Sequence, residues 1–399
     1  MAASLSTTRC FKGWVLPGAR ATTRRSTADP TASFLSSTSL ETAPDGVLAA
    51  VTTVMGSGHV PGLSLAVVER DRLLLAAGFG TADLASATPT MPTTSYLWFS
   101  MSKIVTATAA LRLADQGRLD LDAPVGDYVE YLRAPGPLQP TVRQLLNHTS
   151  GLGNPLPIRW AHLADAPPPD PEALLRRLMS HRHAFRYEIG TAAHYSNVGY
   201  LAVGQVIAAT AEQPFQTYVQ QTVLDPAGMA RTGFSYQDGA DAATGYVRSP
   251  RIVDPVLRRV LPAGVAGSRH GGYLALNRFY VDGPAYGGLV GDVLDAGQFL
   301  RLHLGDGQLD GHRVLAPETT RRMRRLDQTG KPFDHGLGWF RKTSTGRGDW
   351  VEHFGAGVGF WNVMRLYPRR GLGIAVMANS TTTYDFEPLF ALLAGATWP

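Results

Sequence analysis

Segments with the apolar pattern of β-strands stand in two groups near opposite ends of this chain. Residues 62–69 and 73–80 form the first group, and the short polar connection between them predicts a hairpin. Segments with helical spacing fill the middle of the chain. The second group of strands comprises residues 337–342, 350–355, 360–367 and 372–378. The simplest closed architecture joins both groups in one antiparallel sheet and lets the middle form a helical lobe.

This arrangement predicts an α+β fold with two lobes. Residues 45–99 and 331–399 form the sheet lobe, whose antiparallel sheet is flanked by helices. Residues 100–330 form an all-helical lobe and the cover over the site, and within them the Gly- and Pro-rich stretches 154–171 and 235–290 are expected to be irregular. We assign both lobes to one domain, residues 45–399.

Residues 1–44 differ from the rest of the chain in composition. They are rich in Ser, Thr, Ala and Arg and nearly free of acids, which resembles an organelle transit peptide. A disordered extension, or a start codon placed too far upstream, is the simpler interpretation. The compartment stays open, with a soluble cytoplasmic location favoured, because the leader lacks the apolar core of a secretory signal.

The net charge of +5 originates in this leader. Residues 1–28 hold five basic residues and no acid, and the remaining chain balances 32 basic against 32 acidic residues. The charge therefore gives no reason to expect a nucleic-acid partner. The single cysteine, Cys10, excludes an intrachain disulfide. No apolar stretch is long enough to span a membrane, and the sequence does not predict an oligomeric state.

Ser100 and Lys103 stand three residues apart at the start of a predicted helix. This spacing places both side chains on one face, one turn from each other. A neutral amine beside a hydroxyl can take its proton, and burial lowers the pKa of a Lys toward that state. We therefore interpret Ser100 as a nucleophile and Lys103 as its base, although a chance Ser-x-x-Lys pair at a helix start is the simpler alternative.

Two further stretches can complete such a site. In Tyr195-Ser196-Asn197, the tyrosine hydroxyl can relay a proton and the asparagine amide can hold a Lys or a substrate carbonyl. The alternative is that Ser196 or Asn197 only caps the helix that follows. Residues 350–360 form a strand followed by closely spaced glycines, which lets backbone N–H groups approach a ligand, or simply makes a glycine-rich hairpin.

Together, these stretches resemble the Ser-x-x-Lys, Tyr-x-Asn and Lys/His/Trp-x-Gly boxes of the serine β-lactamase and penicillin-binding-protein superfamily. The third box is His353-Phe354-Gly355, and the order and spacing of all three match. The resemblance is greatest to class C β-lactamases, family VIII carboxylesterases and D-Ala-D-Ala carboxypeptidase-like hydrolases. Three further stretches are similar to the family: residues 145–152, 287–289 and 371–379.

The resemblance implies a β-lactamase/transpeptidase-like fold with the site between its lobes. Ser100 would form an acyl-enzyme, with Lys103 and Tyr195 as general base and then general acid. The backbone N–H groups of Ser100 and Ala356 would bind the oxyanion, and Asn197 would orient Lys103 and the acyl group. His353 and Gly355 belong to the third box beside the substrate. No metal or organic cofactor is implied.

The third box also bears on the substrate. Dedicated β-lactamases of this superfamily carry Lys where this chain has His353, and a His is charged only part of the time near neutral pH. Tight binding of a carboxylate-bearing β-lactam is therefore less expected than binding of an uncharged ester. The sequence predicts a carboxylesterase on small esters. The alternatives are β-lactam or D-Ala-D-Ala amide hydrolysis, acyl transfer, and a catalytically silent binding protein.

Other hydrolase classes fit the sequence poorly. An α/β-hydrolase needs Gly-x-Ser-x-Gly, which does not occur. A zinc site would use His181, His183 and His194, but the His-Glu-x-x-His motif is absent. No phosphate-binding loop or dinucleotide fingerprint is present.

Overall fold

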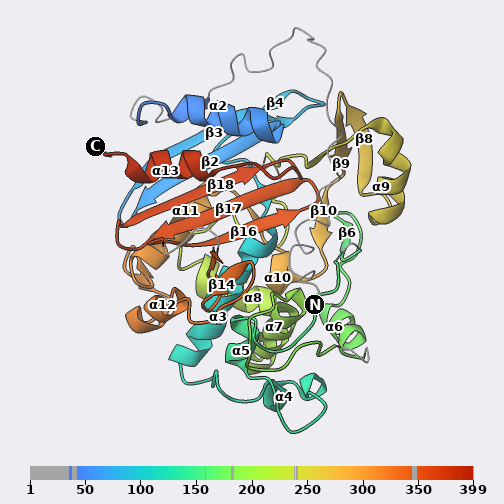
Figure 1. Cartoon of the computed structure of the whole chain (residues 1–399), viewed down its shortest axis with the longest axis vertical. Helices are drawn as coiled ribbons and strands as arrows, with labels where there is room; N and C mark the ends of the chain where they lie inside the picture. The colour runs from blue at the N-terminus through green and yellow to red at the C-terminus, as the bar shows by residue number, and fades with distance from the viewer. Residues whose placement is uncertain are drawn as a thin grey trace, which may run out of the picture.

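The predicted α+β fold is confirmed by a computed structural model, which describes residues 36–37, 43–157, 159–180, 184–237, 239, 241–343 and 348–398 (Figure 1). Within this part of the chain, nine strands form one antiparallel sheet. Its strand order is β1 (Ser36–Ser37), β3 (Leu73–Asp83), β2 (Gly62–Glu69), β18 (Leu372–Ala378), β17 (Phe360–Tyr367), β16 (Val351–Gly357), β15 (Phe340–Lys342) and β14 (Phe333–His335), with β4 (Thr88–Pro89) paired to β3.

The two ends of the domain meet where β2 pairs with β18, in the register Leu65 opposite Val376. Alternate side chains of β2 enter two different cores. Leu63, Leu65 and Val67 pack in one core with α2 (Val47–Gly58) and α13 (Glu387–Gly395). Ala66 and Val68 join the other core, with α11 (Val293–Leu304). Both faces of the sheet are therefore covered, which explains why β18 is apolar and buried along its whole length.

The helical lobe lies beneath the sheet in Figure 1 and surrounds α3 (Ser102–Asp115). Every residue of α3 from Ser102 to Leu111 is buried, in agreement with its nearly continuous run of apolar and small side chains. The other helices of this lobe are α4 (Val125–Tyr128), α5 (Val142–Leu146), α6 (Pro171–Met179), α7 (Asn197–Ala211), α8 (Phe215–Val219) with a following π turn (Gln220–Leu224), α10 (Pro284–Gly287) and α12 (Pro317–Met323).

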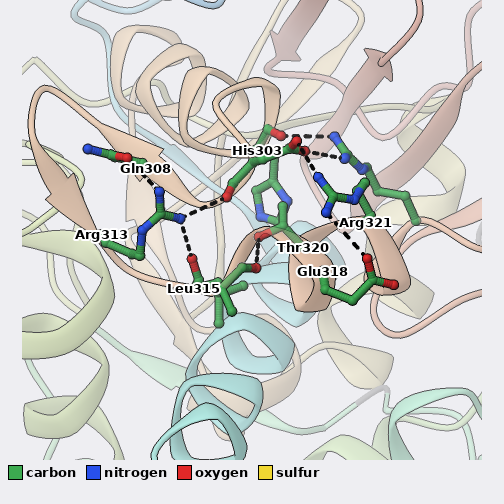
Figure 2. A network of polar contacts seen from close by, with 10 residues as sticks. His303, Gln308, Arg313, Leu315, Glu318, Thr320 and Arg321 are labelled. Atoms are coloured by element: carbon green, nitrogen blue, oxygen red, sulfur yellow. Dashed lines mark hydrogen bonds and ion pairs between the residues drawn. The ribbon is translucent and has the colours of Figure 1, made fainter.

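Helix α11 lies within residues 100–330 but packs on the sheet, against β2 and β18. An arginine-rich network joins its C-terminal end to α12 (Figure 2). Arg324 donates to the carbonyl oxygen of His303 at 2.9 Å and pairs with Asp306 at 2.7 Å. Arg321 also pairs with Asp306, at 2.9 Å. Cationic donors at a helix C-terminus satisfy carbonyl groups that have no partner within the helix.

Residues 154–171 and 235–290 contain more regular structure than expected. β6 (Ala161–Leu163) pairs with β10 (Phe279–Val281), and β7 (Tyr246–Arg248), β9 (Tyr273–Leu276) and β8 (Ala266–His270) form a small sheet beside α9 (Asp254–Val260). Strands of three to five residues are too short to show a periodic pattern. The remaining short elements are β5 (Tyr96–Leu97), η2 (Phe99–Met101), η3 (Glu130–Leu132), η5 (Arg251–Val253), β11 (Val290–Gly291), β12 (Gln308–Leu309) and β13 (His312–Arg313).

Most of the 1–44 leader, together with His181 and His183, lies outside the described residues. Among the helices that are described, none combines the length and the apolar character needed to cross a bilayer.

A buried ion cluster fixes β16 to its neighbours. Arg365 on β17 donates to the carboxylate of Glu352 on β16 at 2.6 Å and to that of Glu387 on α13 at 2.7 Å. The side chains of Arg365 and Glu352 are 2% and 0% exposed, and burial raises the pKa of Glu352 despite its partner. The cluster matters for the site because Glu352 directly precedes His353.

Replacing Arg365 with Met would leave the Glu352 carboxylate buried without its cation. We expect the free energy of unfolding, measured in urea, to fall by about 3–5 kcal/mol. The exposed pair of Arg72 and Glu69 is the control, and Arg72→Ala should cost less than about 1 kcal/mol. Equal losses of unfolding free energy in the two variants would contradict the view that the buried Arg365 cluster stabilises the fold.

Candidate active site

Ser100 lies in the 3₁₀ turn η2, immediately before α3, rather than in the first turn of the α-helix as predicted. Phe99 has a φ angle of +47°, a left-handed conformation that is rare for an aromatic residue. Its ring packs against the rings of Phe279 and Phe360 at centroid distances of 6.4 and 6.2 Å. A sterically unfavourable backbone held in place by its surroundings is a common feature of functional sites.

Lys103 is fully buried and its amine touches three oxygens from three elements. Nζ lies 3.0 Å from Ser100 Oγ, 2.8 Å from Asn197 Oδ1 and 2.9 Å from the carbonyl oxygen of Tyr286 on α10. All three oxygens are uncharged. Burial therefore lowers the pKa of Lys103 well below its usual value of 10.5.

Tyr195 and Asn197 reach the amine from the segment that leads into α7. Nζ lies 4.8 Å from the centroid of the Tyr195 ring. Ser196 is the N-cap residue of α7, since its Oγ accepts from the N–H of Gly199 at 3.0 Å. Ser196 therefore caps the helix, as the simpler alternative predicted. The side-chain amide of Asn197 instead contacts Lys103.

Strand β16 passes directly beside the turn that carries Ser100. A Cβ atom at Gly355 would stand 2.1 Å from the carbonyl oxygen of Trp98, so only glycine fits there. Ser100, Asn197 and Ala356 line a cavity of about 60 Å³. The structure therefore brings Ser100, Lys103, Asn197 and the third box together.

The walls of this cavity are largely apolar. They include Phe99, Trp160, Phe279 and Tyr286, and no charged side chain lines the cavity within the described part of the chain. A wider hollow of about 590 Å³ lies nearby between α6 and α7, but it contains none of the predicted site residues. We take the smaller cavity as the candidate site because Ser100 opens into it.

His353 is buried and held by its own strand. Its Nδ1 lies 2.8 Å from the carbonyl oxygen of Phe354, so Nδ1–H donates and Nε2 is left as an acceptor. Among the described residues, Nε2 has no hydrogen-bond partner. Burial, together with the nearby Lys103, lowers the pKa of His353 well below 6.5, so the side chain is neutral at pH 7.

Three residues that the structure places here had no predicted role in the site. Tyr286 supplies a carbonyl oxygen to Lys103, and the following residues 287–289 had drawn attention only as a family-like stretch. His148 and His335 lie at centroid distances of 4.6 and 6.3 Å from the Tyr195 ring. Only the family-like stretch 145–152 signalled His148, and nothing in the sequence signalled His335.

Both the sequence and the fold of this chain are similar to those of known proteins. Residues 47–396 match the Beta-lactamase family model. Protein Rv1367c of Mycobacterium tuberculosis (strain H37Rv) is 31% identical over 309 residues, covering 70% of this chain and 71% of that protein. The octameric penicillin-binding protein homologue from Pyrococcus abyssi has a TM-score of 0.70 at 22% identity, covering 87% of this chain and 76% of that one. EstCE1, described as a hydrolase with promiscuous acyltransferase activity, has a TM-score of 0.66 at 19% identity, covering 88% and 97%.

The low pKa of Lys103 has a measurable consequence for stability. Between the pKa of Lys103 in the folded protein and its unfolded value near 10.5, the unfolded chain binds one proton more at this residue than the folded protein does. The free energy of unfolding must then rise with pH, by about 1.4 kcal/mol per pH unit. We expect urea unfolding at pH 7, 8 and 9 to show this slope for the wild type relative to Lys103→Met. If the unfolding free energies of the wild type and Lys103→Met changed with pH in parallel, the lowered pKa of Lys103 would be contradicted.

Proposed function

The chain belongs to the β-lactamase family, and from this premise we propose that it is a carboxylesterase that forms an acyl-enzyme on Ser100. The β-lactamase-family fold is that of a serine hydrolase. The choice of substrate and the roles of the individual residues are inferred from the site.

The position of the Lys103 amine carries the proposal. A neutral amine has two N–H donors and one lone pair. Asn197 Oδ1 and the Tyr286 carbonyl oxygen can only accept, so they take the two N–H groups. The lone pair is left for the third neighbour, and Ser100 O–H can donate to it across 3.0 Å. This is the arrangement that a base needs to activate a serine.

Acylation follows from this geometry. Lys103 takes the proton from Ser100 as Oγ attacks the ester carbonyl carbon. The resulting oxyanion is bound by the backbone N–H groups of Ser100 and Ala356. Tyr195, whose ring lies beside Nζ, passes the proton from Lys103 to the departing alkoxide, which leaves as the alcohol.

Deacylation reverses the proton path. Water replaces the alcohol and gives a proton to the Tyr195 and Lys103 pair as it attacks the acyl carbonyl. Ser100 Oγ then leaves with that proton, and the carboxylic acid is released. Asn197 holds Lys103 in place through both steps.

The size and lining of the cavity favour a substrate with a compact, uncharged acyl group. Tyr195 must reach the departing alcohol, and it does not line the cavity, so we assign the cavity to the acyl side. A cavity of about 150 Å³ holds a benzene ring, and a volume of about 60 Å³ suits only a short chain. His353 is neutral and offers no cation to a substrate carboxylate, unlike the Lys of dedicated β-lactamases.

We expect the protein to hydrolyse p-nitrophenyl acetate and butyrate, and nitrocefin far more slowly. Ser100→Ala should abolish turnover, while Lys103→Ala and Tyr195→Phe should each lose at least ~10²-fold in kcat/KM. Lys331→Ala and Tyr273→Phe are matched controls outside the site and should retain wild-type rates.

Other outcomes would contradict the proposal in different ways. Faster turnover of nitrocefin than of either ester would identify a β-lactamase. Activity that survives Ser100→Ala would exclude the acyl-enzyme. Absence of all turnover, together with no fluorophosphonate labelling of Ser100, would indicate a binding protein.

Trp160 provides a test of the acyl cavity. Its indole ring forms one wall and packs edge-on against Tyr286 at a centroid distance of 5.9 Å. Trp160→Ala should raise the ratio of kcat/KM for p-nitrophenyl octanoate to that for the acetate by about 10-fold or more. Trp398→Ala, near the C-terminus, is the control and should leave this ratio unchanged. An unchanged ratio in Trp160→Ala as well would contradict the assignment of the cavity to the acyl group.

A further inference from the structure

The family-like stretch 145–152 has no role in the mechanism above, yet it contains a residue with unusual geometry. His148 follows α5, is buried, and has a φ angle of +65°. Left-handed backbone is uncommon outside glycine and costs free energy. Its neighbour Asn147 stabilises the turn, since its side chain accepts from the N–H and the hydroxyl of Thr149 at 3.2 and 2.7 Å.

His148 makes hydrogen bonds to the residues on both sides of Tyr195. The N–H of His194 donates to the His148 carbonyl oxygen at 2.8 Å. The N–H of Ser196 donates to His148 Nδ1 at 3.1 Å. The backbone N–H groups of the residues before and after Tyr195 are thus both hydrogen-bonded to His148.

The imidazole ring of His148 also packs on the side chain of Tyr195. The two ring centroids are 4.6 Å apart, with an angle of 34° between the planes. The His148 ring also contacts the rings of Tyr200 and His335, at centroid distances of 5.2 and 4.7 Å. The Tyr195 ring in turn lies 4.8 Å from Lys103 Nζ. The orientation of the phenol relative to the amine therefore depends on where His148 sits.

We propose that His148 is a positioning residue that sets the place of the Tyr195 hydroxyl through its bond to Ser196 and its ring contact. This inference rests on the proposed function, in which Tyr195 moves the proton between Lys103 and the alcohol. His148 itself touches neither the substrate nor the proton that is transferred.

Burial keeps His148 in the state that this role requires. The titratable groups that face it are Lys103, His335 and His353, with the phenols of Tyr195 and Tyr200. Burial is the main cause that lowers the pKa of His148 well below 6.5, and the basic groups nearby lower it further. The Nδ1 lone pair therefore stays available to the Ser196 N–H at neutral pH. A proton on Nδ1 would remove this lone pair and break the hydrogen bond from the Ser196 N–H.

Two substitutions separate the hydrogen bond from the ring contact. His148→Phe keeps an aromatic ring but loses the acceptor. His148→Asn keeps an acceptor close to Nδ1 and tolerates a positive φ angle. Thr149→Val is the matched control, because it removes the Thr149 hydroxyl bond within the same turn without touching residues 194–196.

We expect His148→Phe to lower kcat for p-nitrophenyl butyrate by about 10- to 100-fold with little change in KM, the size of a disturbed acid–base step. His148→Asn should recover at least part of this loss. Thr149→Val should lose comparable stability in urea but keep its kcat. A double variant of His148→Phe and Tyr195→Phe should be no slower than Tyr195→Phe alone, because one residue acts through the other.

Four results would overturn the inference. Wild-type kcat in His148→Phe would exclude a positioning role. A kcat loss in Thr149→Val equal to that in His148→Phe would reduce His148 to a structural part of the turn. Multiplying losses in the double variant would show that the two residues act independently. If the wild type hydrolyses the ester and Tyr195→Phe matches it in rate, the assigned role of Tyr195 is wrong and this inference is wrong with it.

Discussion

The buried amine of Lys103 is the constraint on which the site depends. Removing a positive charge from water is expensive, and the protein offers Lys103 only uncharged oxygens as partners. Burial therefore favours the neutral amine, which is the state in which it can accept a proton. The three oxygens come from η2, α7 and α10, so the position of the amine requires that these elements pack together correctly.

The surroundings of the amine follow the same electrostatic logic. His148, His335 and His353 are all buried near Tyr195, and burial lowers the pKa of each, for His335 to about 3. None of the three adds a positive charge at neutral pH. The aromatic and aliphatic lining of the cavity, the proposed acyl site, extends this uncharged environment. In the proposed mechanism one negative charge develops, on the oxyanion, and the backbone N–H groups of Ser100 and Ala356 bind it.

Much of the fold could be predicted because its long elements carry strong patterns. The limits of β2, β17 and β18 were predicted to the residue. The three-residue strands β6, β10 and β14 were missed because so short a segment has no measurable period. Helix α2 had no counterpart among the predicted elements. Helix α11 lies in the segment that was assigned to the helical lobe, but its packing on the sheet depends on the path of the chain.

The sequence by itself determined the candidates for the chemistry: the spacing of Ser100 and Lys103 is local, and helical geometry alone places both on one face. The order of the boxes likewise indicated the family. Only the tertiary structure decided that the amine contacts Asn197 and the carbonyl oxygen of Tyr286, and that His148 holds the segment around Tyr195. Those contacts join residues 48 to 183 positions apart and in part use backbone atoms, which every residue has and no sequence pattern can distinguish.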